Sequence, residues 1–357
     1  MTREPNPSSE PTPWAPPSPR ELPALREHLS NYLRSVPAHL LTAELLRRGR
    51  GTLRPAAADP DDGAALLLED ERQRLSRARL YYVTSDITKL VRHAARNLKD
   101  TWDIQPEDLP ALTGFMLFAE PIAEYLREDD GTPVRIVAVS WGQTKLMSDQ
   151  HGGLWLTFWS VTNFAGIISL ARALGVPASE AERQARIQHA ELTWDNEIYL
   201  PWGLTQAAVP EPRDFDVRIV DPTTLAAAKT TIDWLRVVHA GWIFCQPNTF
   251  TDVAEQPLRR TMRRRAEQAG LAPSTVRVVS VSQKTRPRAA KPAEPSGRSV
   301  GVRFPVAPFL RRQPYGPERS LRRWTLVAGH WRGPADAPVH IGNKVNLVDT
   351  PSTKRSD

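Results

Sequence analysis

Residues 134–161, VRIVAVSWGQTKLMSDQHGGLWLTFWSV, contain two apolar runs separated by a polar segment. The runs 134–142 and 153–161 are rich in Val, Ile, Leu, Trp and Phe, which are typical of strands, and residues 143–152 have the composition of a loop. A third run, GFMLFAEPI at 114–122, precedes them, and EDDGTP at 128–133 separates it from the next run. With LYYVT at 80–84 as a fourth strand, the spacing predicts an antiparallel sheet.

Helices are predicted on both sides of these runs along the chain. In residues 87–98 the apolar side chains recur at helical spacing behind Asp86, which is a suitable N-cap. Residues 222–244 are apolar nearly all round, which is typical of a helix buried in the middle of a fold. We therefore predict an α+β fold: an antiparallel sheet with helices on one face, an N-terminal helical appendage and a basic C-terminal β segment.

Composition divides the chain into five parts. Residues 1–20 hold seven prolines and few apolar residues, which predicts a disordered arm. The remaining parts are a helical appendage at 21–60, a central α+β region at 61–256, a basic helix with a β segment at 257–348, and a disordered tail at 349–357. Whether 257–348 forms one domain with 61–256 stays open at this point.

The charge is unevenly distributed. The whole chain has a formal net charge of +7, but residues 257–357 hold 21 Lys and Arg against 6 Asp and Glu, whereas residues 1–256 hold 26 against 34. Such a basic region suits the neutralisation of phosphates, and it equally suits an acidic protein partner.

The most basic stretch of this region is RRQPYGPERSLRRWTLVAGHWRGP at 311–334. Residues 313–316 are typical of a turn between two strands, with arginines crowded on either side. Guanidinium groups suit phosphates, and aromatic faces can stack on unpaired bases. The residues predicted to contact nucleic acid here are Arg311, Arg312, Tyr315, Arg322, Arg323, Trp324, Trp331 and Arg332. The alternative is that the tryptophans pack inward and the arginines are merely solvated.

A predicted helix at 258–270 carries a second basic group. Arg259 and Arg263 lie four residues apart, as do Arg260 and Arg264, so that like charges repel along one face. An anionic partner would relieve this repulsion, and we expect Arg259, Arg263 and Arg264 to contact phosphates. A solvated helix face is the alternative.

Signals for catalysis are weak. The chain has none of the common phosphate-loop, dinucleotide, zinc-protease or nucleophile-elbow motifs, and its single cysteine, Cys245, cannot form a multi-cysteine site. We predict no metal and no cofactor. The candidate catalytic residues are Tyr82, Asp86, Glu120 and His330.

Several blocks of the sequence resemble an uncharacterised family of proteins from high-GC actinobacteria, their plasmids and their phages. The blocks are LYYVTSDITKLVRHAARNL, EDLPALTGFMLFAEPI, RRTMRRRAEQAGL with VRVVSV, and RRQPYGPERSLRRWTLVAGHWRGPADAP with KVNLV, and they span about residues 80–348. The resemblance implies an association with mobile elements and no particular activity. Where relatives tend to have His-Trp before the paired basic residues, this chain has Phe309 and Leu310.

Together these features predict a nucleic-acid-binding accessory protein that binds through its C-terminal basic helix and hairpin, with DNA and RNA not distinguished. An enzyme that acts on nucleotides or nucleic acid is the first alternative, and a protein-interaction or assembly component with an acidic partner is the second. No run of apolar residues has the length of a membrane span and no secretory signal is visible, so we expect no membrane partner and a cytoplasmic location. The oligomeric state is not predicted.

Overall fold

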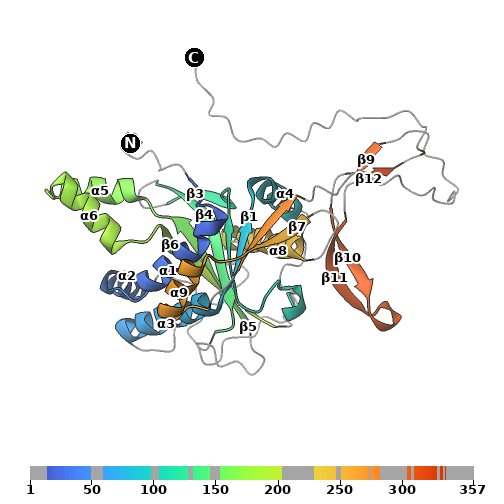
Figure 1. Ribbon diagram of the computed structural model, residues 1–357, viewed down its shortest axis with the longest axis horizontal. Coiled ribbons are helices and arrows are strands. Elements are labelled where there is room, and N and C mark those ends of the chain that lie inside the picture. The colour runs from blue at the N-terminus through green and yellow to red at the C-terminus, as the bar shows by residue number, and fades with distance from the viewer. Residues whose placement is uncertain are drawn as a thin grey trace, which may run out of the picture.

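The computed structural model (Figure 1) describes most of the chain between residues 14 and 334. The described residues are 14–49, 59–96, 98, 104–127, 132–144, 153–202, 229–246, 251–272, 275–281, 304–306, 309–327, 330–332 and 334. The predicted tail at 349–357 and most of the predicted proline-rich arm lie outside them. Within that arm Trp14 is described, and it packs against the hydrophobic core because its indole offers a large apolar surface.

An eight-stranded mixed sheet forms the centre of the molecule. The strands lie in the order β6-β5-β4-β2-β1-β8-β7, and β3 pairs with the first half of β4. Their bounds are β1 (Arg79–Val83), β2 (Gly114–Phe118), β3 (Ala123–Leu126), β4 (Pro133–Gly142), β5 (Gly153–Val161), β6 (Leu192–Pro201), β7 (Thr251–Gln256) and β8 (Val276–Val281). The α+β class is thus confirmed.

The sheet is not purely antiparallel as predicted, because β1 runs parallel to both β2 and β8. Parallel neighbours need a crossover, and α4 (Ser85–Ala95) supplies it between β1 and β2. β2, β4 and β5 are antiparallel as expected, and β6 extends this meander by one further antiparallel strand.

Both faces of the sheet are covered, so the prediction of helices on one face was wrong. Side chains of adjacent strand residues point to opposite faces, and Tyr81 and Met116 belong to one buried cluster whereas Leu80 and Phe115 belong to the other. The strand-forming runs are apolar at consecutive positions, and such a strand has to be buried on both faces.

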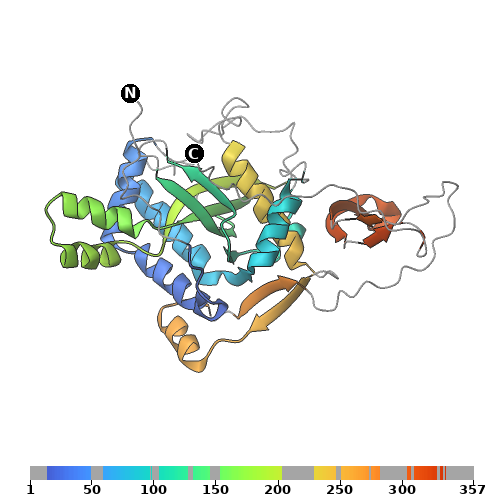
Figure 2. The same ribbon diagram turned by 90° about the horizontal axis from the view of Figure 1, so that it is seen from above.

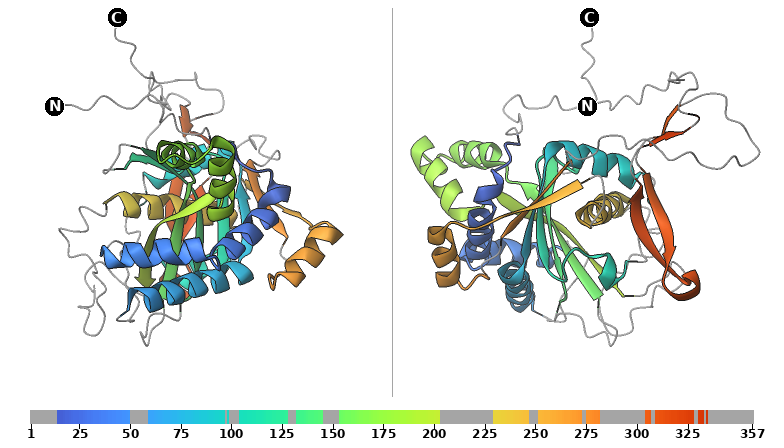
Figure 3. Two further views of the ribbon diagram at one scale, coloured as in Figure 1. Left: turned by 90° about the vertical axis from the view of Figure 1, so that its left-hand side faces the viewer. Right: turned by 45° about the vertical axis from the view of Figure 1, so that its right-hand side comes forward.

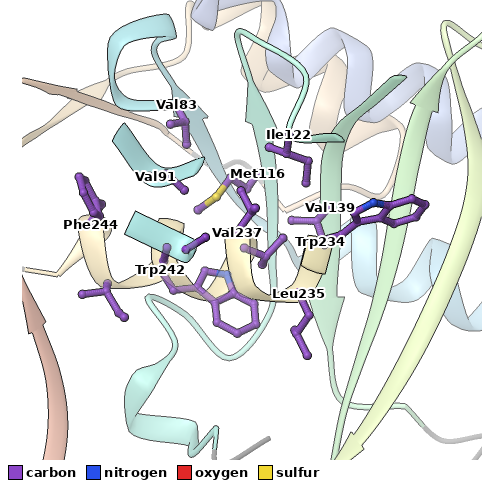
Figure 4. Close-up of a cluster of buried hydrophobic side chains, with 14 of the residues drawn as sticks. Val83, Val91, Met116, Ile122, Val139, Trp234, Leu235, Val237, Trp242 and Phe244 are labelled. Atoms are coloured by element: carbon purple, nitrogen blue, oxygen red, sulfur yellow. The ribbon is translucent and has the colours of Figure 1, made fainter. Parts of the chain in front are cut away.

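On one face, α4 and α8 (Lys229–Cys245) pack side by side against the sheet (Figure 4). From α8, Trp234, Leu235 and Trp242 are buried against strand residues such as Met116 and Val139. This confirms the expectation that the long apolar helix lies inside the fold.

On the opposite face, α1 (Leu22–Tyr32) and α3 (Pro60–Arg77) complete the second buried cluster, and α2 (Val36–Arg47) packs on α3 (Figure 2). Leu22 and Leu29 are fully buried, and the guanidinium of Arg26 donates to the carbonyl oxygens of Ala78 and Ala272 at 3.2 and 2.8 Å. Residues 21–60 are therefore not an appendage, since α1 is part of the core.

A buried ionic network fixes α3 to β4 and β5. Glu71 is fully buried and accepts hydrogen bonds from Ser140 at 2.5 Å, Thr157 at 2.7 Å and Arg74 at 2.5 Å. The Arg74 guanidinium also pairs with Asp70 and lies 5.1 Å from the centre of a Trp155 ring. Every charge in the network has a partner, so no charge is left buried without compensation, and the hydrogen bonds connect α3 to both strands.

The remaining elements lie around this centre. They are α5 (Phe164–Ala173), α6 (Ala178–Gln188), α9 (Arg260–Gln268), β9 (Phe304–Val306), β10 (Phe309–Tyr315), β11 (Leu321–Val327), β12 (His330–Arg332) and the short 3-10 helices η1 (Pro19–Glu21), η2 (Pro106–Asp108) and η3 (Pro317–Arg319). β10 and β11 form one two-stranded sheet, and β9 and β12 form another.

Candidate nucleic-acid interface

The hairpin β10–β11 is attached to the core through α8. Leu310 and Leu326 lie opposite each other in the hairpin, and both are buried in the cluster that α8 helps to form. Trp324 on the same hairpin face packs against this cluster, and its ring lies edge-on to His239 of α8 with 6.5 Å between ring centres. This inner face holds the hairpin in place. Trp324, one of the residues predicted to contact nucleic acid, is half-buried here and packs inward.

The other face of the hairpin points away from α8. Side chains that lie opposite each other across the two strands share a face, so the register defines the members of this outer face. They form four cross-strand pairs: Phe309 with Val327, Arg311 with Thr325, Gln313 with Arg323, and Tyr315 with Leu321. Arg311 and Arg323 are exposed, and the guanidinium of Arg323 lies 5.2 Å from the centre of the Tyr315 ring.

The turn of the hairpin lies later in the sequence than predicted. Residues 313–315 belong to β10, and the chain turns at residues 316–320. Pro314 is tolerated within β10 because a two-stranded ribbon consists of edge strands, where a residue without an N–H group fits. Glu318 and Arg319 both have positive φ, at 53° and 56°, and the Ser320 N–H donates to the Pro317 carbonyl at 3.1 Å.

The hairpin is strongly basic, and three of its arginines form no ion pair with the described residues. Glu318 is the only acidic residue between 309 and 327, against five arginines. Within the described part of the chain, no carboxylate forms an ion pair with Arg311, Arg322 or Arg323. Arg312, on the inner side of the ribbon, is exposed as well. The hairpin therefore presents positive charge to the solvent on a support anchored in the core.

Helix α9 forms the second basic surface. Arg259, Arg263 and Arg264 are all exposed, whereas Ala266 is buried and the helix packs on α1. At the end of this row, Arg265 pairs with Glu27 of α1 at 2.7 Å. Gly270 follows the end of the helix with a φ of 69°, the left-handed conformation that a glycine cap provides.

The two basic surfaces lie on opposite sides of the central sheet (Figure 3, right). α9 packs on α1, on the face of the second cluster, whereas the hairpin packs on α8, on the face of the first. The structure therefore does not join them into one surface. Of the remaining predicted contacts, Arg332 is exposed at the end of β12, and the side chain of Trp331 lies outside what the structure describes.

The four candidate catalytic residues do not assemble into one described site. Tyr82 is buried in the second cluster, and burial raises the pKa of its hydroxyl. Asp86 is exposed at the start of α4, and Glu120 accepts a hydrogen bond from Ser85 and lies 3.9 Å from Lys89. His330 belongs to β12, in a separate two-stranded sheet, and its side chain is not described.

The described residues also have features that bear on a metal centre, a reactive thiol and a membrane-spanning helix. No group of three or more His, Cys, Asp or Glu among the described residues is arranged to hold a metal ion. Burial raises the pKa of the Cys245 thiol, so the sulfur is kept protonated and is a poor nucleophile. None of the described helices is long and apolar enough to cross a membrane.

Sequence reasoning missed Gln313 and Thr325 on the outer face of the hairpin. Both are uncharged, so they did not stand out among the arginines. The signal that would have found them is alternation: in a strand, every second residue from Arg311 and from Arg323 shares their face.

Comparisons with known proteins identify no family. No protein-family model matches the sequence, and no curated protein matches it. A solved structure titled "Crystal structure of AcrVA2" aligns over 75% of this chain and 77% of its own, at 10% sequence identity and a TM-score of 0.33. A likeness at this level does not inform the fold or the function.

Proposed function

We propose that this protein binds nucleic acid through the hairpin β10–β11. The observation that carries the proposal is that Arg311, Arg322 and Arg323 are exposed, without carboxylate partners among the described residues. They lie on a ribbon that Leu310, Trp324 and Leu326 anchor to the core. A surface with like charges held close together gains most from an anionic partner, and phosphates are the anions that guanidinium groups fit best. The fixed support reduces the ordering that binding would otherwise require.

The α9 surface is proposed as a second, independent phosphate contact. Arg259, Arg263 and Arg264 are exposed on the opposite side of the sheet, so they meet a different nucleic-acid segment from the one on the hairpin. The resemblance of the sequence blocks to proteins of plasmids and phages favours a role on a mobile element, and the proposal places the protein in the cytoplasm with its nucleic acid.

The test measures the binding of the full chain to fluorescent oligonucleotides by anisotropy over a range of salt concentrations. The hairpin variant replaces Arg311, Arg319, Arg322 and Arg323 by Gln. If these four residues contact phosphates of a duplex, the slope of log K against log salt falls by about 3 to 4, at about 0.9 per contact. The control variant replaces four exposed arginines on other elements by Gln, namely Arg92, Arg96, Arg172 and Arg186.

The two variants change the net charge equally, so they separate a local surface from general attraction. We expect the control to lower the affinity only slightly. Equal loss in both variants, or no binding by the unaltered chain at low salt, would show that the hairpin is not the interface. A complex with cellular protein that survives nuclease digestion, from a chain that binds no oligonucleotide, would instead favour the acidic-partner alternative.

A further inference from the structure

The outer face of the hairpin carries residue types that recognise base edges in protein–DNA complexes. The two central pairs are Arg311 with Thr325 and Gln313 with Arg323. Arginine donates two hydrogen bonds to O6 and N7 of guanine, glutamine pairs in the same way with N6 and N7 of adenine, and threonine contacts either edge. No carboxylate lies among the outer-face residues to oppose the approach of DNA.

The spacing of these pairs matches duplex DNA. Residues two apart on one strand are separated by about 6.6 Å, which is close to two steps of about 3.4 Å along a DNA strand. The strands of a ribbon lie about 4.8 Å apart, and a major groove about 12 Å wide admits a two-stranded ribbon with its side chains. The two polar pairs therefore span about three consecutive base pairs.

Apolar residues flank the polar pairs on the same face. Phe309 lies at one end with 37% of its surface exposed, and Leu321 lies at the other with 49% exposed. The methyl group of thymine in the major groove offers side chains of this kind an apolar contact.

Single strands suit this face less well. A base that stacks on the hairpin needs a free aromatic face, but Trp324 points inward to α8 and the guanidinium of Arg323 already lies over the Tyr315 ring. Duplex RNA is disfavoured too, because its major groove is too deep and narrow for side chains to read.

We infer that the outer face of β10–β11 enters the major groove of duplex DNA and reads its sequence through Arg311, Gln313, Arg323 and Thr325. Arg322, on the inner side of the ribbon, is left to contact the phosphates that border the groove. The inference rests on the proposed function and narrows its partner to B-form DNA.

The first experiment compares three probes of one sequence with the full chain: a 16-base-pair DNA duplex, the corresponding RNA duplex and the single DNA strand. The duplex DNA is obtained by rounds of selection from a randomised pool. We expect it to bind at least tenfold more tightly than either other probe at the same salt concentration, and we expect selection to enrich a short motif that contains G and A.

The second experiment uses substitutions that keep the net charge of the hairpin but remove the groups that would hydrogen-bond to bases. Arg311→Lys and Arg323→Lys retain a positive charge but lose the two-pronged donor, and Gln313→Ala loses the amide. Each should lower the affinity for the selected duplex about 5- to 100-fold, which is the range of one bidentate base contact, and leave the affinity for an unrelated duplex unchanged. Arg92→Lys, at an exposed position of α4, is the matched control.

The outcomes distinguish this inference from the proposed function. Binding to all three probes with equal affinity, or losses that are the same for selected and unrelated duplexes, would overturn groove reading while nucleic-acid binding stands. Tighter binding to the single strand than to the DNA duplex would also overturn groove reading and leave nucleic-acid binding in place. Absence of binding to any probe at low salt would overturn both. Because the substituted residues point away from the core, unchanged circular dichroism is expected for every variant.

Discussion

Arg74 and Arg72 lie two residues apart on α3 in opposite environments. Arg74 has 3% of its side chain exposed and pairs with the equally buried Glu71, whereas Arg72 pairs with Glu69, whose side chain is 48% exposed. Removal of one member of a buried ion pair leaves the other without compensation in a medium of low dielectric constant. The same change at the surface leaves a charge that water solvates.

We therefore expect Arg74→Leu to lower the free energy of unfolding by about 3 to 5 kcal/mol. The matched change Arg72→Leu should cost less than about 1 kcal/mol. Urea unfolding followed by circular dichroism measures both values. If the two substitutions destabilised the protein to the same extent, the buried network would not be what fixes α3 to the sheet.

The turn of the hairpin contains a second residue-scale test. Arg319 has a φ of 56°, a conformation that costs an L-residue with a Cβ atom about 1 kcal/mol or more relative to glycine. Arg319→Gly should relieve this strain and slow hydrogen exchange of the hairpin amides about fivefold, equivalent to about 1 kcal/mol. Arg311→Gly, within β10, should instead speed exchange, because glycine weakens a strand. The same direction for both would contradict a strained turn.

At the scale of elements, α1 is joined to the start of β6 by an ion pair. Nδ1 of His28 lies 2.5 Å from a carboxylate oxygen of Glu191, and both side chains are about half exposed. The hydrogen bond to Glu191 raises the pKa of His28 above 6.5, and the same bond lowers the pKa of Glu191 below 4.5. The pair is therefore fully charged between these values.

The contribution of this pair to stability should depend on pH in a defined window. The raised His28 pKa gives stability that is complete below pH 6.5 and is lost as the pH rises through the folded-state pKa, and the lowered Glu191 pKa gives stability that is lost as the pH falls below 4.5. His28→Ala should lower the free energy of unfolding by at most about 1 kcal/mol at pH 5.5. At pH 8, where the pair is no longer charged, the same substitution should lower it less. Urea unfolding at the two pH values tests this, and an effect that grew with pH would contradict it.

The positions of many helices and strands are predictable from the sequence, but the pairing of distant strands is not. Periodicity located the meander, the buried α8 and the basic α9 because each carries its own apolar or charged pattern. It missed β7, whose residues TDVAEQ are mostly polar, since a strand at the end of a sheet needs few apolar side chains. Parallel pairing of β1 with β8 joins segments almost two hundred residues apart, and no local pattern encodes such a contact.

The sequence likewise predicted some features of the candidate site and not others. The basic composition of 311–323 was visible in the sequence, as was a turn, although Pro314 suggested the wrong position for it. Which face each side chain occupies depends on register and on the packing of Leu310 and Leu326 against α8. Only the folded structure shows that Trp324 faces inward and that Gln313 shares a face with Arg323.

For the whole molecule, the opposite placement of the two basic surfaces has a measurable consequence. A chain that binds one duplex on the hairpin and another on α9 brings the two together. Donor- and acceptor-labelled 16-base-pair duplexes should therefore show energy transfer when the full chain is added. Replacement of Arg259, Arg263 and Arg264 by Gln should abolish the transfer and leave most of the anisotropy signal of a single duplex.

The control for this measurement is the hairpin variant, which should lose both the energy transfer and the anisotropy signal of the duplex that the hairpin binds. Energy transfer that persisted in the α9 variant would mean that the chain self-associates or that α9 does not contact nucleic acid.

The attachment of the hairpin also bears on how such a protein can diversify. Three inward side chains, Leu310, Trp324 and Leu326, hold the ribbon on α8, and none of the outward residues belongs to either buried cluster. Outward substitutions that keep strand-forming residues should therefore change the free energy of unfolding little. Exchange of the outward residues therefore changes the charge and chemistry of this surface at positions separate from those that hold the fold together.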